Sequence, residues 1–163
     1  MNARNETITL PISAVLRHTP AATLAQALLD QLTNGHDGAA SLPGTTPLPP
    51  IGAEWNGGLY AGLSIADNVP VALVLLPGDE NLNWSDAQAW AEKQGGVLPS
   101  RFDHLVLLKN LKNQFKPEWY WSDEHFASYD GYAWIQSFLN GFQFYYRKSD
   151  NYRARAVRRL VIQ

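Results

Sequence analysis

The chain contains no cysteine among its 163 residues. This absence excludes disulfides, thiolate metal sites and cysteine nucleophiles, so the fold must be stable without covalent cross-links. Long apolar runs are also absent, because the longest, residues 69–76, is far too short to cross a bilayer. The N-terminus lacks the basic stretch and apolar segment of a secretory signal. The sequence therefore predicts a soluble protein without membrane insertion, and leaves its location open between the cytoplasm and a virus particle.

Charged residues are few and unevenly distributed, with a net charge of -2 at pH 7. From Asn140 onward the basic residues are Arg147, Lys148, Arg153, Arg155, Arg158 and Arg159, against Asp150 alone. Arg153 and Arg155 are expected on one face of a strand, where neighbouring tyrosines could help them to bind nucleic acid. No nucleic-acid motif accompanies them, and such arginines commonly pair with acidic helix residues or with Glu118 and Asp130. The balance disfavours a nucleic-acid partner.

Candidate catalytic and metal-binding residues are sparse. The four histidines, at positions 18, 36, 104 and 125, have none of the spacings typical of metal sites, and His104 is expected at the surface or half-buried. Ser122 and His125 flank two carboxylates, but adjacent side chains of an extended segment point to opposite faces. We therefore expect no catalytic activity, no cofactor and no metal requirement. A weak calcium site in residues 123–130 is the one alternative left open.

Residues 1–52 are predicted to form an N-terminal strand-helix arm and a linker. Residues 6–12 alternate like a strand, and residues 19–33 carry leucines at helical spacing. Residues 35–52 are rich in glycine and proline and predict a linker. Because a short helix is marginal in water, we expect Leu24, Leu28 and Leu32 to pack against the main domain or a second copy. Residues 1–50 are thus the candidate segment for homo-oligomerisation.

Residues 53–163 are predicted to form the main domain. Two strands, 59–64 and 69–77, are expected around a turn at residues 66–68. A helix over 84–93, capped by Asn83 or Ser85, should bury Trp84, Ala87, Ala91 and also Trp90. Ser100 and Asp103 form a capping-box pattern that starts a second helix. Its expected apolar stripe consists of Phe102, Leu105, Val106, Leu108 and Leu111. Alternating segments at 118–122, 132–138, 141–148 and 152–162 then predict an antiparallel meander, which makes the fold class α+β.

Several of these segments resemble one known family. "WSDAQAWAEKQGGVLPSRFDHLVLL", "YWSDEH", "AWIQSFLNG" and "KSDNYRARAVRR" occur in the order of a bacterial and phage family with a C-type-lectin-like fold. That group is known mostly as a domain of unknown function and is also called the Lcl C-terminal-like family. The resemblance covers about residues 57–161. It implies a C-type-lectin-like domain, of two helices plus antiparallel strands, related to the ligand-display modules of adhesins and phage tail tips.

The last quarter of the chain combines aromatic and polar residues in the way that binding surfaces do. Trp119, Trp121, Trp134, Phe138 and Phe142 are expected to pack into the core. If Phe142 and Phe144 face the core, strand alternation places Tyr145 and Arg147 in solvent; the opposite parity would make Tyr145 a core residue. The predicted ligand-binding residues are Glu124, His125, Tyr129, Tyr132, Tyr145, Arg147, Asn151 and Tyr152.

These patterns and the resemblance together predict a function. We expect a non-catalytic, calcium-independent ligand-binding or display protein of a phage or prophage. Its ligand would be a glycan or a protein surface, as in adhesion or host recognition. The alternative is a structural or assembly protein of a phage particle that oligomerises through its N-terminal arm.

Overall fold

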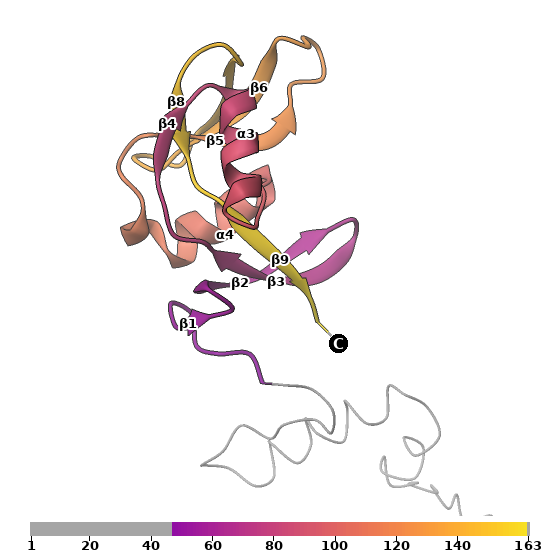
Figure 1. Ribbon diagram of the computed structural model, residues 1–163, viewed down its shortest axis with the longest axis vertical. Helices are drawn as coiled ribbons and strands as arrows, with labels where there is room; N and C mark the ends of the chain where they lie inside the picture. Colours follow the sequence, from indigo (N-terminus) through magenta and orange to yellow (C-terminus); the bar gives the residue numbers. More distant parts are fainter. Residues whose placement is uncertain (1–46, 163) are drawn as a thin grey trace, which may run out of the picture. The chain divides into compact units, whose positions relative to one another are not determined.

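Two β-sheets and two α-helices make up residues 47–162, the part of the chain that the computed structural model describes (Figure 1). The predicted strand 6–12, the helix 19–33 and most of the linker 35–52 lie outside the described residues. Residues 47–50 have no regular structure, and residues 51–52 form a turn. None of the described helices has the length and apolar content needed to cross a membrane. The α+β class predicted from the sequence is confirmed for this part of the chain.

The smaller sheet joins the first and last strands of the described residues. Its order is β1 (Glu54–Trp55), β2 (Gly58–Ala66), β3 (Val69–Leu75) and β9 (Val157–Val161), and all of its pairs are antiparallel. Asp67 and Asn68 connect β2 to β3 with φ angles of 50° and 63°. Asn and Asp adopt this left-handed conformation more readily than most residues, which favours a tight hairpin. The predicted hairpin is confirmed.

The larger sheet has the order β4 (Glu80–Leu82), β8 (Tyr152–Ala154), β5 (Trp119–His125), β6 (Tyr132–Ser137) and β7 (Gln143–Arg147). Strands β5, β6 and β7 form the predicted meander. The prediction of one strand over 152–162 is wrong, because β8 pairs with β4 and β5 whereas β9 crosses to the smaller sheet. The buried Ala154 and Ala156 flank this crossing and leave room for the chain between the sheets.

Both helices predicted for residues 53–163 are present, and of the two caps considered for the first, Asn83 rather than Ser85 is the one observed. Helix α3 (Trp84–Lys93) starts after Asn83, whose side chain accepts a 3.0 Å hydrogen bond from the Asp86 N–H. It buries Trp84, Ala87 and Ala91 as predicted, whereas Trp90 is only half-buried. Helix α4 (Arg101–Asn110) starts at a complete capping box between Ser100 and Asp103. These local signals depend on neighbouring residues only, so they can be found in the sequence.

The buried face of α4 differs from the predicted apolar stripe. Phe102 and Leu105 are 47% and 48% exposed, whereas Asp103 and His104 are fully buried beside Leu107. The expectation of a surface or half-buried His104 is therefore wrong as well. The cause is a polar partner: Arg159 of β9 donates two hydrogen bonds to the Asp103 carboxylate, which holds that face of the helix inward.

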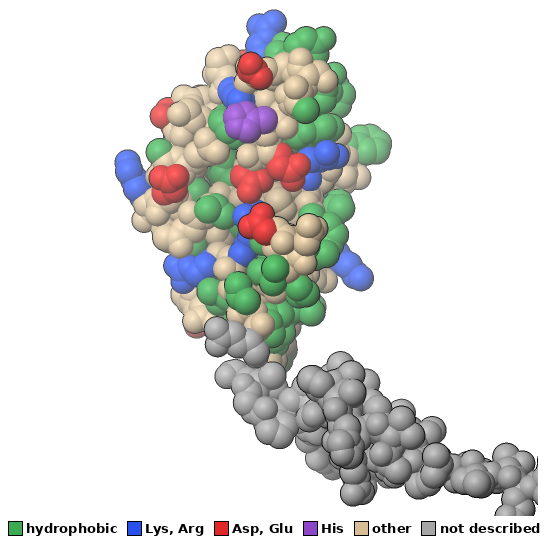
Figure 2. All heavy atoms as spheres, turned by 90° about the vertical axis from the view of Figure 1, so that its right-hand side faces the viewer, with side chains coloured by type: hydrophobic (Ala, Val, Ile, Leu, Met, Phe, Trp, Pro, Cys, Tyr) green, Lys and Arg blue, Asp and Glu red, His purple; other side chains and the backbone are tan. Residues whose placement is uncertain are grey.

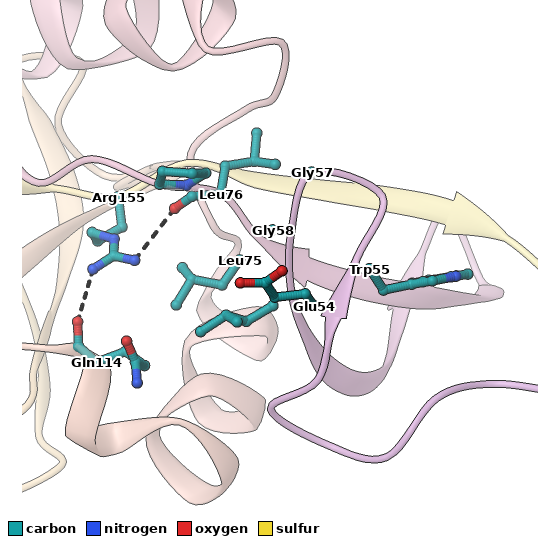
Figure 3. A pocket seen from close by; sticks show the side chains of 10 residues that line it. Glu54, Trp55, Gly57, Gly58, Leu75, Leu76, Gln114 and Arg155 are labelled. Atoms are coloured by element: carbon teal, nitrogen blue, oxygen red, sulfur yellow. Dashed lines mark hydrogen bonds between the residues drawn. The ribbon is translucent and has the colours of Figure 1, made fainter.

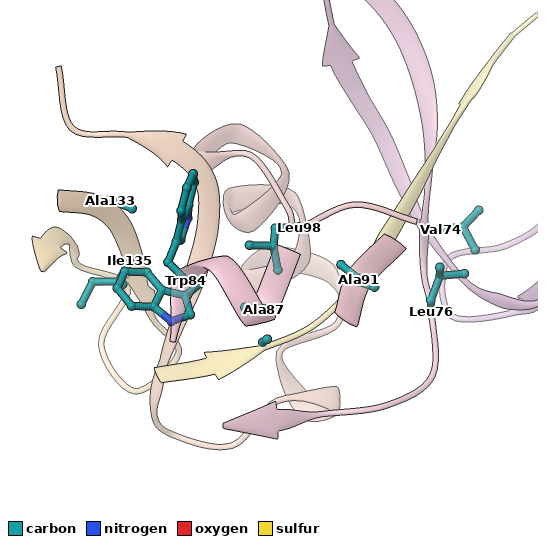
Figure 4. Packing of buried hydrophobic residues seen from close by; sticks show 11 residues of the cluster. Val74, Leu76, Trp84, Ala87, Ala91, Leu98, Ala133 and Ile135 are labelled. Carbon is teal, nitrogen blue, oxygen red and sulfur yellow. The ribbon is translucent and has the colours of Figure 1, made fainter. Parts of the chain in front are cut away.

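The core consists of two apolar clusters. In the first, shown in Figure 4, α3 packs between Val74 and Leu76 on one side and Ile135 of β6 on the other. The second surrounds Phe138 and Tyr120 beneath α4. Trp121 and Phe138 are buried as predicted, Trp119 and Trp134 are half-buried, and Phe142 is 68% exposed. The expected core position of Phe142 is thus wrong.

Gly58 is a position where the fold leaves no room for a side chain. A Cβ atom there would lie 2.3 Å from the Leu75 carbonyl oxygen, so Gly58→Ala requires β2 and β3 to separate. We expect this substitution to lower the free energy of unfolding by about 1–3 kcal/mol, as in other overpacked sites. Urea denaturation measures the loss. Gly131→Ala is the matched control, because its Cβ would meet nothing within 4 Å. Equal stability of the two variants would contradict this prediction.

Candidate ligand-binding surface

Aromatic side chains gather on the β6–β7 hairpin and on the loop that precedes it. We call this group the aromatic cluster. Its members, linked by ring contacts, are Phe126, Tyr129, Tyr132, Trp134, Phe144, Tyr145 and Tyr146. Figure 2 shows hydrophobic side chains, tyrosines included, reaching the surface in the upper part of the molecule, where Figure 1 places β6. None of the seven belongs to either buried core cluster.

Three rings of the cluster form a parallel stack. Tyr145 lies between Phe144 and Phe126, with centroid distances of 4.8 and 3.7 Å and interplanar angles of 9° and 8°. Tyr129 continues the stack from Phe126 at 5.9 Å and 23°. The two end residues, Phe144 and Tyr129, are 49% and 60% exposed. Large apolar surfaces at both ends of a rigid stack therefore remain in contact with solvent.

The orientation of β7 is opposite to the one expected from the sequence. Tyr145 is half-buried, whereas Phe144 and Tyr146 are 49% and 42% exposed. On β6, Ile135 pairs with Phe144, so their Cβ atoms lie on the same side of the sheet, and Ile135 belongs to the buried cluster that includes α3 residues. The buried core reaches Ile135 and does not extend to β7 at the edge of the sheet. The assumption that this face of β7 is buried is therefore wrong.

The half-buried face of β7 is fixed by the start of α4. Arg101 lies 3.6 Å above the Trp134 ring, and its Nε donates a 2.9 Å hydrogen bond to Gln143 Oε1. The Gln143 side-chain nitrogen returns a 2.9 Å bond to the Arg101 carbonyl. Trp134 and Tyr145 are direct partners across the β6–β7 pair, so their rings meet at 5.8 Å. The Trp134 ring, fixed by Arg101, therefore packs against Tyr145 and holds that ring of the stack in place.

Polar groups border the exposed side of the cluster. Arg147 Nε donates to the Tyr132 hydroxyl at 3.3 Å. A shallow hollow of about 510 Å³ is lined by Tyr132, Phe144, Tyr145, Tyr146, Arg147 and Asp150. Tyr152 packs on Tyr146 at 5.3 Å, and burial raises the pKa of Tyr152 to about 12. Its hydroxyl therefore stays neutral at physiological pH. The hollow combines apolar ring faces with one cation, one carboxylate and phenolic hydroxyls.

The predicted site residues divide into two groups. Four of them, Tyr129, Tyr132, Tyr145 and Arg147, come together at the cluster. Tyr152 borders them through Tyr146, and Asn151 is exposed just before β8. The predicted site does not include Phe126, Phe144 or Tyr146, which the structure adds to it. The signal that could have found them is the density of aromatics between residues 126 and 146.

Glu124 and His125 have other contacts. Glu124 accepts a 2.7 Å hydrogen bond from the Arg101 backbone N–H, which anchors the start of α4. His125 packs on the Trp84 ring at 4.7 Å, and its Nδ1 lies 2.6 Å from Lys148 Nζ. Lys148 also donates to the Asp130 carbonyl. These side chains support the loop and helix next to the cluster rather than the hollow itself.

The described residues contain no group of three His, Asp or Glu side chains placed to hold a metal ion. In the segment considered for calcium, the Asp123 carboxylate is bonded to Arg159 at 3.0 Å. Comparison of the chain with models of protein families finds no match, and comparison with curated proteins finds none either.

Proposed function

We propose that this chain is a non-catalytic ligand-binding protein whose main domain has a C-type-lectin-like fold and recognises a glycan through the aromatic cluster. Two helices followed by antiparallel strands agree with the family resemblance of residues 57–161. The observation that carries the proposal is the ring stack with both ends exposed, because a stable fold gains nothing from leaving such rings in water. A display role on a phage or prophage product follows from the resemblance.

The chemistry of the hollow favours a sugar as the ligand. One face of a pyranose ring presents C–H groups, which pack on aromatic rings, while its hydroxyls require both donors and acceptors. Phe144 and Tyr146 supply ring surface; Arg147 donates, and Asp150 accepts. Recognition sites of this type combine a mostly apolar surface with a few placed polar groups. This arrangement needs no metal ion to hold the sugar.

A nucleic acid fits the same hollow less well. Arg147 is the single cation that lines it, and Asp150 lies in the same lining. Phosphate backbones are bound by several basic side chains acting together. Two arginines of this region are engaged elsewhere, since Arg153 of β8 pairs with Asp79 at 2.5 Å and Arg159 of β9 with Asp103 at 2.5 Å. Because Asp79 neutralises Arg153, the predicted pair of Arg153 and Arg155 does not present two free positive charges to a phosphate backbone.

The test is to remove the exposed ring ends. We expect Phe144→Ala and Tyr129→Ala each to weaken glycan binding at least tenfold, which corresponds to about 1.4 kcal/mol. Their melting temperatures should change little, because both side chains are largely exposed. A glycan array selects the sugar, and isothermal titration calorimetry with and without EDTA measures its affinity.

Phe102→Ala is the matched control for this experiment. Phe102 is 47% exposed on α4 and lies outside the aromatic cluster, so its loss should leave sugar binding unchanged. Absence of any glycan binding by the full chain would overturn the proposal, and so would equal affinities of the three variants. If the chain instead binds a protein, and this binding depends on Phe144 and Tyr129 in the same way, the ligand is a protein surface rather than a glycan.

A further inference from the structure

A second hollow lies apart from the aromatic cluster, between the β1–β2 hairpin, the end of β3, the short 3₁₀-helix η2 (Lys112–Gln114) and the link from β8 to β9 (Figure 3). Its volume is about 460 Å³, within the range of about 300–1,000 Å³ that is typical of small-molecule sites. It shares no lining residue with the hollow beside β7. A ligand here would be independent of the glycan proposed above.

Most of the wall of this hollow is apolar. Leu59 from β2, Leu75 from β3 and the following Leu76 and Pro77 line it together with Trp55. Gly58 allows the β2 backbone to approach Leu75 closely, which brings these side chains together. Such a wall excludes water from an apolar ligand body and gains free energy from the buried area. Charged groups are limited to the two that face the hollow from opposite elements, Arg155 and Glu54.

Arg155 carries a positive charge for which the described residues supply no ion-pair partner. Its Nη1 donates to the Gln114 carbonyl at 2.7 Å and its Nη2 to the Leu76 carbonyl at 3.3 Å, and both acceptors are neutral. The carboxylate of Asp79 is the acidic group that most favours the charged form of Arg155. That carboxylate is already bonded by Arg153 and by the Tyr120 hydroxyl. Burial lowers the pKa of Arg155, which reflects the cost of holding this charge away from water.

The Arg155 guanidinium also has unused hydrogen-bonding capacity. A guanidinium has five N–H donors, of which the two terminal nitrogens hold four. Each terminal nitrogen donates one bond to a carbonyl and keeps a second N–H, whereas Nε is buried and has no acceptor among the described residues. Contact with the Phe115 ring at 5.1 Å fixes the orientation of the group. An arginine held in this way is suited to bind a carboxylate, which supplies a negative charge and accepts hydrogen bonds.

We propose that this hollow binds a small monocarboxylate with an apolar body, whose carboxylate pairs with Arg155. The apolar body lies on Leu59 and Pro77, and Trp55 borders it, while the nearly inaccessible Leu75 and Leu76 close the hollow from the core side. Glu54, on the β1 side, disfavours a second negative charge on the ligand, because like charges in a partly buried site repel. The ligand class is therefore a monoanion of fatty or aryl-alkyl acid type rather than a dicarboxylate.

The first test uses the unmodified full chain and compares each acid with its neutral amide. Phenylacetate and octanoate are titrated against phenylacetamide and octanamide, and affinity is measured by calorimetry and by the NMR shift of the Trp55 indole N–H. Of phenylacetate and octanoate, we expect the one with the higher affinity to bind at least tenfold more tightly than its own amide and to shift the Trp55 signal. Equal affinity of acid and amide, or no binding of either acid, would overturn the proposal.

Substitution of Arg155 provides the second test. Arg155→Gln is expected to reduce acid binding to the level of the amide, whereas Arg155→Lys should keep part of the preference for the acid. Arg158→Gln is the control, because Arg158 bonds to the Gly95 and Asn56 carbonyls and does not line the hollow. For the diacid phenylmalonate, Glu54→Gln should increase affinity. An acid affinity that is the same in Arg155→Gln as in the unmodified chain would contradict the assigned role of Arg155.

Discussion

Replacement of Arg159 by methionine is expected to lower the free energy of unfolding by about 3–5 kcal/mol, the usual cost of leaving a buried charge without its partner. Asp103 is fully buried, and its carboxylate accepts hydrogen bonds from Arg159 Nε at 2.8 Å and Nη2 at 2.5 Å. Ser64 and the Ser100 backbone N–H also donate to it. Methionine would keep most of the apolar contacts of the arginine side chain but would leave the Asp103 charge with neutral donors only.

Arg158→Met is the matched control for this experiment. Arg158 neighbours Arg159 on the same strand, but it bonds only backbone carbonyls at an exposed site, so its loss should cost little. Adding Asp103→Leu to Arg159→Met should recover part of the lost stability, since an apolar pair needs no counter-charge. Urea denaturation measures all three proteins. Similar costs for Arg158→Met and Arg159→Met would contradict the assignment of Arg159 as the structural counter-ion.

Acid is expected to destabilise the protein through His104. Its ring is fully buried against Phe138, neither ring nitrogen has a hydrogen-bond partner among the described residues, and burial lowers the pKa of His104 to about 3. The charge of Asp103 opposes this shift without reversing it. In the unfolded chain the pKa of a histidine is about 6.5. As the pH falls below that value the unfolded chain takes up a proton and the folded protein does not.

The contribution of His104 is therefore fully present above about pH 6.5 and is lost as the pH falls towards about 3. The expected slope is about 1.4 kcal/mol per pH unit for one proton. His104→Leu should remove this slope. Burial raises the pKa of Asp123, which acts in the opposite direction, because a carboxyl that is easier to protonate when folded adds stability as the pH falls. Asp123 is present in both proteins, so their difference isolates His104. Parallel stability–pH profiles would contradict the prediction.

Local signals explain why much of the fold could be predicted. The capping box of Ser100 and Asp103, the turn at Asp67 and Asn68, and the apolar face of Trp84, Ala87 and Ala91 all act within a few residues of one another. Their physical chemistry is the same in any fold that contains them. For this reason the helices and the β2–β3 hairpin begin and end close to where the sequence predicts.

The predictions are wrong where contacts between residues far apart in the sequence determine which side chains are buried. Asp103 and His104 are buried because Arg159, 56 residues after Asp103, supplies a counter-charge that hydrophobic periodicity cannot reveal. The orientation of β7 depends on how far the core under α3 extends, and it stops at β6. Four predicted site residues, Tyr129, Tyr132, Tyr145 and Arg147, still meet at the cluster, through ring contacts of Tyr132 with Tyr129 and Tyr145 and its hydrogen bond with Arg147. Phe144 is missing from the predicted site because the predicted orientation of the strand starts from a core position for Phe142 and Phe144.

Because β9 pairs with β3, the C-terminal end of the domain and strand β6 lie at opposite ends of it. Strand β1 and the C-terminal end both lie at the lower end of the domain in Figure 1, and β6, which carries part of the aromatic cluster, lies towards the upper end. A linker attached beyond β9 would therefore leave the molecule at the end away from the ring stack. Copies immobilised through such a linker on a sensor chip or a bead would direct the end of the domain that carries β6 outward, so coupling at the C-terminal end would keep that end open to a ligand.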